Sequence, residues 1–193
     1  YKKEALLAMR GYIDRLDDPK GKWEKTLPAA PNRKTLGHYM ILANLAQVLE
    51  DCMGIKDYEV HADRAVDMVL GTFYNSDLKT IFENVSFDQE SSEYYFDLKS
   101  CDGRHLNPGH GLEALWFVMD RLLKKGDEER AKIAAKTVLG QLKKGWDQEY
   151  GGIYYFMDAL GKPHEELSWN MKLWWVHNEA ILACMYGYLI TRN

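Results

Sequence analysis

The sequence has few of the features that mark disulfide-rich, metal-binding or membrane proteins. Its 193 residues include three cysteines, Cys52, Cys101 and Cys184, which are odd in number, widely spaced and without a Cys-x-x-Cys pair. We therefore expect no disulfide framework and no metal site, and a cytoplasmic location fits best. No run of about 18 apolar residues is present, so no membrane span is expected. No signal peptide is visible. Because the sequence begins with Tyr1 rather than Met, a leader could precede it in a longer gene product.

Basic charge is also scarce. The sequence has 25 Lys and Arg against 29 Asp and Glu, which gives a net charge of -4. This balance argues against nucleic acid as the main partner. No glycine-rich phosphate loop, HExxH or GxSxG motif occurs. Aromatic residues, in contrast, reach 12%, with six Trp and twelve Tyr. Such a content suits a sugar-binding pocket, and it suits a heavy aromatic core equally well.

Hydrophobic periodicity predicts an all-α fold built from about six helices. The helices are expected at residues 2–16, 34–52, 56–73, 108–124, 127–142 and 168–190. Helix-breaking residues at 17–21 and prolines within 26–33 mark loops, and short β-ribbons are expected at 80–85 and after the turn that begins at Trp146. Helical hairpins of this kind pack as bundles, solenoids or toroids. No linker divides residues 1–193, so a single domain is expected.

One helix start combines polar groups with an apolar face. Pro108 suits the first helical position, and Asn107 can cap the free N–H groups. His110, Glu113 and Trp116 then share about a third of the helix circumference. This arrangement favours a functional site with a titratable ring beside a carboxylate. A structural ion pair between His110 and Glu113 is the alternative that the residues leave open.

The last predicted helix carries a second group. Trp175 and Glu179 are four residues apart and share a face, whereas His177 points roughly the opposite way. Trp175 alone would suit a core position. Glu179 lies among apolar residues, and carboxylates are seldom buried without a partner. We therefore expect Glu179 either to pair with another protein group or to bind a polar ligand.

These segments resemble one known enzyme family. The motif NPGH at 107–110 with Glu113 and Trp116, the segment WDQEYGGIYYF at 146–156, and WNMKLWWVHNEA at 169–180 look like the N-acylglucosamine 2-epimerase family, called renin-binding protein in animals. The block NVS at 84–86 also fits. Cellobiose 2-epimerases resemble the first block, but they typically carry Asp where Gly111 stands and Gln where His177 stands. The N-acylglucosamine branch is therefore preferred.

The resemblance implies an (α/α)6 toroid, of which this chain would be the middle half. It also implies an enzyme that inverts C2 of an N-acyl-hexosamine, with His110, Glu113 and Glu179 as catalytic residues. Trp116 and Trp175 would line the faces of the sugar. The family's N-terminal Arg would lie before Tyr1, and its second catalytic His after Asn193. The resemblance implies no required cofactor. It leaves ATP open as an allosteric activator, with the loop that carries Arg33 and Lys34 as a candidate position, and a homodimer is plausible by family analogy.

Three other functions stay open at this stage. An aldose–ketose isomerase, or a 2-epimerase acting on mannose or a disaccharide, would use the same groups. A non-catalytic helical interaction protein would use exposed apolar helix faces. A toroid glycosidase with two carboxylates is less favoured, because the best-placed polar group is a histidine. The remaining histidines are expected to be structural or surface residues: His38, His61, His105 and His164.

Overall fold

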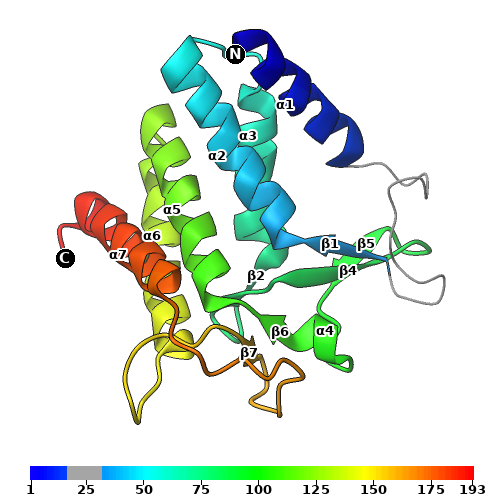
Figure 1. The fold of residues 1–193 in the computed structure, drawn as a ribbon, viewed down its shortest axis with the longest axis vertical. Helices are drawn as coiled ribbons and strands as arrows, with labels where there is room; N and C mark the ends of the chain where they lie inside the picture. Colours follow the sequence, from blue (N-terminus) through cyan, green and yellow to red (C-terminus); the bar gives the residue numbers. More distant parts are fainter. Residues whose placement is uncertain (17–31) are drawn as a thin grey trace.

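The computed structural model describes residues 1–16 and 32–193, and helices make up most of it (Figure 1). The helices are α1 (Lys2–Leu16), α2 (Leu36–Met53), α3 (Glu59–Asp67), the π-helical η1 (Met68–Phe73), α4 (Cys101–Arg104), α5 (Pro108–Lys125), α6 (Glu128–Gly145) and α7 (Trp174–Thr191). The strands are β1 (Arg33–Thr35), β2 (Tyr74–Asn75), β3 (Thr80–Ile81), β4 (Asn84–Asp88), β5 (Glu93–Tyr95), β6 (His105–Leu106) and β7 (Met157–Asp158).

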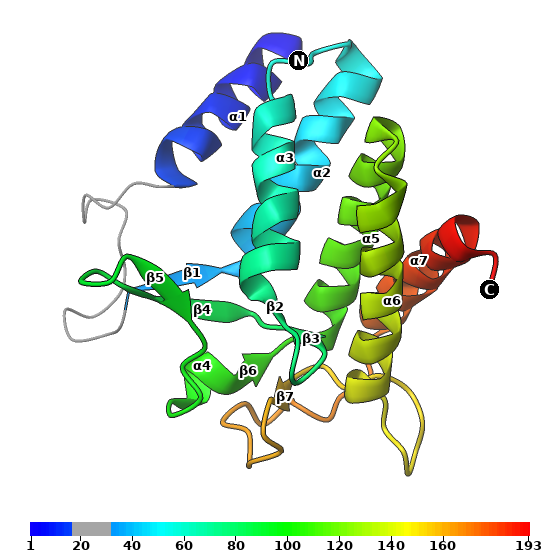
Figure 2. The same ribbon diagram turned by 180° about the vertical axis from the view of Figure 1, so that it is seen from behind.

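Helix α5 is the centre of the arrangement. It packs against α2 on one side and against α6 and α7 on the other, while α3 packs against both α2 and α5 (Figures 1 and 2). Its inward side chains Leu112, Leu115 and Met119 are fully buried. Each buried side chain of this size contributes about 1.5–3 kcal/mol to folding. The core therefore fixes α5 firmly, and with it the side chains of its first turns.

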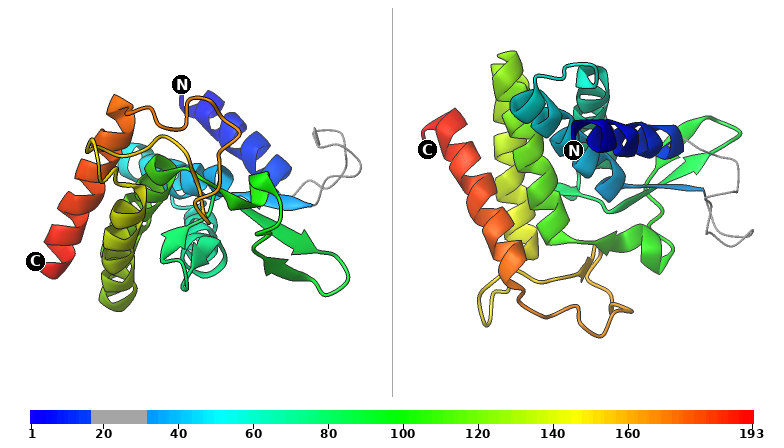
Figure 3. Two further views of the ribbon diagram at one scale, coloured as in Figure 1. Left: turned by 90° about the horizontal axis from the view of Figure 1, so that it is seen from below. Right: turned by 45° about the horizontal axis from the view of Figure 1, so that its top comes forward.

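The short strands gather at the end of the helices where α5 begins (Figures 1 and 2). They form a three-stranded antiparallel sheet in the order β1-β4-β5 and two antiparallel pairs, β2-β3 and β6-β7. The register pairs Arg33 with Ser86 and His105 with Asp158. Viewed from below, the loops that join α6 to α7 cross this same end (Figure 3). The sheets and loops thus surround the N-terminus of α5.

Local capping explains where the long helices begin and end. The side chain of Asn107 accepts a hydrogen bond from the N–H of His110, and Pro108 occupies the first helical position of α5. Asp127 caps α6 in the same way through the N–H of Arg130. Gly126 ends α5 in a left-handed conformation with φ 71°. These signals are visible in the sequence, and the predicted helices 108–124 and 127–142 are confirmed to within a few residues.

Three predicted boundaries were wrong. The last helix begins at Trp174 rather than at residue 168, because the carbonyls of Trp169 and Met171 accept backbone hydrogen bonds from residues 155 and 156. The ribbon predicted at 80–85 is divided into the strands β3 and β4. Between them, the N–H of Phe82 donates to the carbonyl of Phe73 at the end of η1, and the carbonyl of Glu83 accepts the N–H of Leu36 at the start of α2. The aromatic segment after Trp146 is extended and makes one isolated bridge at Ile153, and its strand β7 follows only at Met157.

Two further sequence expectations concern loops and membranes. The breakers at 17–21 and the prolines Pro28 and Pro31 lie outside the described residues. Within residues 1–16 and 32–193, none of the helices combines the length and the apolar character that crossing a bilayer needs.

Candidate active site

His110 lies in the first turn of α5 and faces a carboxylate from another part of the chain. Its Nδ1 atom is 3.0 Å from Oε2 of Glu83, which lies between β3 and β4. The side chain of His110 is 32% exposed, whereas that of Glu83 is only 11% exposed. The ring therefore reaches the surface while its partner is held inside. Glu83, rather than Glu113, is the hydrogen-bonding partner of His110.

Trp175 covers one side of His110. The two ring centroids are 5.7 Å apart with an angle of 41° between the planes, and Tyr155 meets Trp175 edge-on at 6.0 Å. This approach depends on Gly109, because a Cβ atom at that position would lie 2.6 Å from two carbon atoms of the indole. The glycine thus lets α7 bring an aromatic face next to the histidine.

Trp116 and Glu179 form a second contact between α5 and α7. The indole Nε1 donates to Oε2 of Glu179 at 2.6 Å, and the Trp116 ring stacks on Tyr186 at 5.8 Å. The hydrogen bond fixes a carboxylate that would otherwise be costly to bury. Trp116 therefore holds Glu179 in place, in addition to any contact that its ring makes with a ligand. The structure brings all five predicted site residues together across the α5–α7 interface.

Glu113 has the most strongly perturbed acidity of the group. Burial, followed by the charge of Glu179, raises the pKa of Glu113 to about 7, and Glu83 acts in the same direction while His110 opposes it. For His110, burial lowers the pKa, but the hydrogen bond and charge of Glu83 together with the charge of Glu113 outweigh it and raise the pKa above 6.5. Near neutral pH the site therefore holds a carboxyl and an imidazole that can both exchange protons.

The raised pKa of Glu113 predicts a pH-dependent change in stability. Between pH 4.5 and about 7 the folded protein keeps a proton that the unfolded chain has lost, so stability falls as pH rises through this window. With allowance for partial exposure, the ionised group costs about 2 kcal/mol above pH 7. We expect Glu113→Gln to raise the free energy of unfolding by about 2 kcal/mol at pH 8 and by much less at pH 5.

Urea unfolding followed by circular dichroism at both pH values measures this difference. The exposed Glu90, changed to Gln, is the matched control, and its effect should be small and equal at the two pH values. An equal gain for Glu113→Gln at pH 5 and pH 8 would contradict the perturbed acidity.

The sequence pattern did not identify Glu83 as a candidate site residue. It lies 27 residues from His110 in the sequence, so no helical or strand periodicity relates the two residues. A signal was nevertheless present: Glu83 directly follows the buried Ile81 and Phe82, and an acid that continues an apolar run needs a partner. The other site residues were found because each pair shares one helix.

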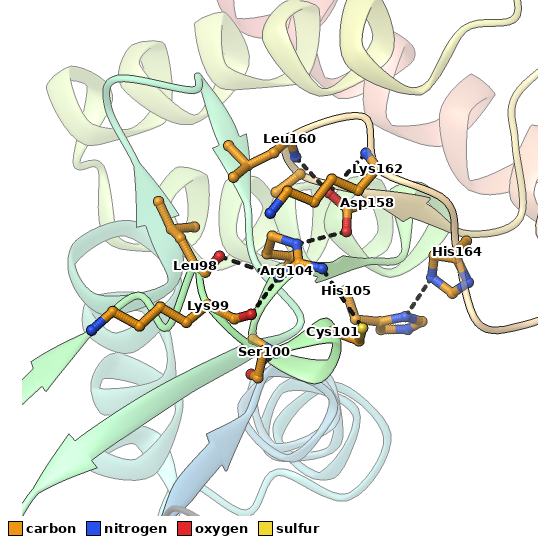
Figure 4. A network of polar contacts seen from close by, with 12 residues as sticks. Leu98, Lys99, Ser100, Cys101, Arg104, His105, Asp158, Leu160, Lys162 and His164 are labelled. Carbon is orange, nitrogen blue, oxygen red and sulfur yellow. Dashed lines mark hydrogen bonds and ion pairs between the residues drawn. The ribbon is translucent and has the colours of Figure 1, made fainter.

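The segment before α5 is fixed by a buried ion pair (Figure 4). Nε of Arg104 donates to Oδ2 of Asp158 at 2.8 Å, and both side chains are almost fully buried. The guanidinium also donates to the carbonyls of Leu98 and Lys99. Next to it, Nδ1 of His105 lies 3.0 Å from Nε2 of His164. These contacts tie the β6–β7 ribbon together and position the chain that leads into Asn107.

Other candidate positions are occupied differently. His177 accepts the N–H of Ile153 through Nε2, and its Nδ1 contacts the carbonyl of Leu173, so both ring nitrogens have backbone partners. Arg33, considered for ATP phosphates, already pairs with Asp97 and Asp102. In the part of the chain that the structure describes, no group of three or more His, Cys, Asp or Glu residues is arranged to hold a metal ion.

A large apolar groove lies elsewhere. It has a volume of about 850 Å³ and runs between α6 and the face of α7 that carries Ile181, Cys184 and Tyr188. Trp175 and Glu179 lie on the opposite face of α7. The imidazole that lines the groove, that of His177, is already hydrogen-bonded to backbone. The polar chemistry is therefore concentrated around His110.

Comparison with known proteins identifies the family to which the chain belongs. Residues 12–193 match the family model described as N-acylglucosamine 2-epimerase (GlcNAc 2-epimerase). The chain belongs to the N-acylglucosamine 2-epimerase family. It is 37% identical to N-acylglucosamine 2-epimerase of Bos taurus and 35% identical to that of Homo sapiens, in each case over 97% of this chain. It spans only 44% and 43% of the length of these two relatives.

Solved structures show the same fold. A D-mannose isomerase superposes with a TM-score of 0.65 at 20% identity, over 88% of this chain and 42% of that one. A sugar epimerase from a ruminal bacterium superposes with a TM-score of 0.60, also at 20% identity, over 83% of this chain and 38% of that one. The predicted fold class, a helical fold of the α/α toroid type that corresponds to about half of such a chain, is confirmed.

Proposed function

We propose that this chain supplies one side of the active site of a sugar epimerase that interconverts N-acetylglucosamine and N-acetylmannosamine. The observation that carries the proposal is the pair His110–Glu83, with the ring partly exposed beside Trp175. A C2 proton of a closed sugar ring is hardly acidic. Once the ring opens, the aldehyde at C1 stabilises the carbanion at C2 as an enolate, so a base near neutral pKa suffices.

Each polar group has a role in this scheme. Glu113, whose pKa of about 7 keeps a protonated fraction at neutral pH, donates a proton to the ring oxygen, while Glu179 accepts the proton of the C1 hydroxyl as the ring opens. His110 removes the C2 proton from one face. Inversion also needs a second acid–base group that returns a proton to C2 from the opposite face, and we propose that this group is not among the site residues described above. Trp175 offers an apolar face to the C–H groups of the sugar.

Family membership and the relatives' names support the activity, while the substrate rests on the relatives alone. Four further proposals accompany this one. The undivided chain suggests a single catalytic domain, and the cysteine pattern suggests a cytoplasmic location. The resemblance suggests a homodimer and activation by ATP without a required cofactor. Trp116 is proposed as a sugar-lining residue as well as the anchor of Glu179.

Sugar NMR in D2O tests the reaction. Incubation with N-acetylglucosamine should produce N-acetylmannosamine, with deuterium at C2 of both epimers, because the abstracted proton exchanges with solvent. A ketose product from mannose would instead establish an aldose–ketose isomerase. If the protein that carries this chain gives neither N-acetylmannosamine nor a ketose, and no deuterium enters C2, the chain is better described as a non-catalytic interaction protein.

A further inference from the structure

Glu83 is held rigidly by groups that have no contact with a ligand. Its backbone carbonyl accepts the N–H of Leu36 at the start of α2, at 2.8 Å. The preceding N–H, of Phe82, donates to the carbonyl of Phe73 at the end of η1, also at 2.8 Å, and the Phe82 ring is fully buried. The following residue begins β4. Three separate elements therefore fix the place from which the carboxylate reaches His110.

The contact determines which ring nitrogen of His110 carries the hydrogen. A carboxylate oxygen only accepts, so Nδ1, at 3.0 Å from Oε2, must be the donor. In the neutral ring the lone pair is then on Nε2. Among the described residues, Nε2 of His110 has no hydrogen-bonding partner, and the side chain is 32% exposed. The basic nitrogen is thus the one available to a ligand.

His177 provides a contrast within the same chain. Its two ring nitrogens are both used by backbone groups, one from Leu173 and one from Ile153. Neither nitrogen of that ring is therefore available to a ligand. His110 is anchored through one nitrogen only, which is the arrangement that a positioned base requires.

We propose that Glu83 is the positioning residue of the epimerisation base: by accepting the Nδ1 hydrogen it fixes the tautomer and orientation of His110, so that Nε2 removes the sugar's C2 proton. The role rests on the proposed function. Glu83 itself does not touch the sugar. It also stabilises the imidazolium that forms when Nε2 takes the proton, because the new positive charge lies next to a buried carboxylate.

Glu113 acts on His110 in a different way. It lies one turn along α5 and raises the imidazole pKa through its charge alone, whereas Glu83 acts through both a hydrogen bond and its charge. Replacing either acid by glutamine should therefore lower the pH at which His110 titrates. Only the change at Glu83 should alter the tautomer, which makes Glu113→Gln the matched control.

The test combines NMR of the imidazole with kinetics. In ¹⁵N-labelled wild-type protein above the titration, the ring of His110 should be in the Nδ1–H form. In Glu83→Gln, the carboxamide can offer its NH2 group to Nδ1, so we expect the Nε2–H form to gain population and the ring to titrate at lower pH. The signal of His177 should stay unchanged in both variants, and Glu113→Gln should keep the Nδ1–H form.

Kinetics separate this role from a structural one. We expect Glu83→Gln to lower kcat by about 10²- to 10⁴-fold, in line with the loss of a correctly placed base, while KM changes by less than about threefold. The limb of the pH–rate profile that reports the base should move to lower pH. A loss in folding alone would lower the active fraction without moving that limb.

Each outcome decides one of the two proposals. An Nε2–H ring in the wild-type protein, a measurement that needs no variant, would overturn the positioning role, as would an unchanged tautomer and rate in Glu83→Gln. If the tautomer changes as expected but wild-type protein shows no exchange at C2, the anchoring of His110 stands and the epimerase assignment fails. If wild-type protein exchanges the C2 proton and Glu83→Gln has the same tautomer and rate as wild type, the epimerase assignment stands and the positioning role of Glu83 fails.

Discussion

His110→Gln is expected to reduce epimerisation by at least about 10³-fold while leaving the helix content unchanged. Glutamine cannot take up a proton near neutral pH, so the step at C2 loses its base. Its amide can still donate to Glu83, and the position is partly exposed, so no buried charge is stranded and no large cavity forms. Initial rates with N-acetylglucosamine, and circular dichroism of both proteins, measure the two effects.

His177→Gln is the matched control for this substitution. It removes an imidazole from the face of α7 that lines the groove beside α6, and that ring binds only backbone groups, at Ile153 and Leu173. We expect lower thermal stability with the rate per folded molecule close to wild type. A wild-type rate in His110→Gln, or an equal loss of rate in both variants, would remove His110 from the proposed mechanism.

The sequence predicted those parts of the candidate site that lie within single helices. His110, Glu113 and Trp116 were recognisable because helical spacing places them on one face, and Asn107 and Pro108 marked where that helix begins. Trp175 and Glu179 followed from the same reasoning on α7. Because these pairings depend only on local geometry, they do not require knowledge of the fold.

The contacts between elements could not be derived in this way. Helical spacing suggested Glu113 as the partner of His110, but the ring instead meets Glu83, which reaches it because β3, two residues earlier, packs against α5. The same limit applies to Trp116, whose hydrogen bond to Glu179 spans 63 positions. Burial of Glu83 within an apolar run was the one local signal, and it indicates a partner without naming it.

The early start predicted for the last helix has a similar cause. The apolar residues before Trp174 continue the helical pattern, but Lys172 is drawn to Asp147 at 2.8 Å, and the backbone at Trp169 and Met171 pairs with the strand-like segment after Ile153. These tertiary contacts override local propensity. They also place Leu173 in an extended conformation, from which α7 begins with Trp174 and brings Trp175 to His110.

Gly111→Ala is expected to lower the free energy of unfolding by about 2–3 kcal/mol, although alanine favours helices over glycine. An added Cβ atom would lie 2.2 Å from Nε2 and 2.6 Å from Cδ of Gln141, which is buried. Gln141 cannot move freely, because its Oε1 accepts hydrogen bonds from Oγ1 of Thr80 and from the N–H of Ile81. Relief of the clash therefore costs buried hydrogen bonds that hold β3.

Gly37→Ala is the matched control, since Gly37 also lies in a helix and its added Cβ atom meets nothing within 4 Å. Its stability should be unchanged or raised by up to about 1 kcal/mol. Urea unfolding followed by circular dichroism compares the two. A Gly111→Ala protein as stable as wild type would show that α5 and α6 are not in such close contact.

The double variant Gly111→Ala/Gln141→Ala separates the clash from any other effect. Gln141→Ala alone removes the hydrogen bonds to β3 and should be destabilising, but it also removes the atoms that the new methyl group would meet. In that background we expect Gly111→Ala to cost less than about 0.5 kcal/mol, so the two changes are strongly non-additive. The same close contact explains why this chain has glycine after His110: an aspartate there would need even more of the space that Gln141 occupies. Because Gln141 anchors β3, and β3 leads directly to Glu83, the glycine supports the carboxylate that holds the histidine.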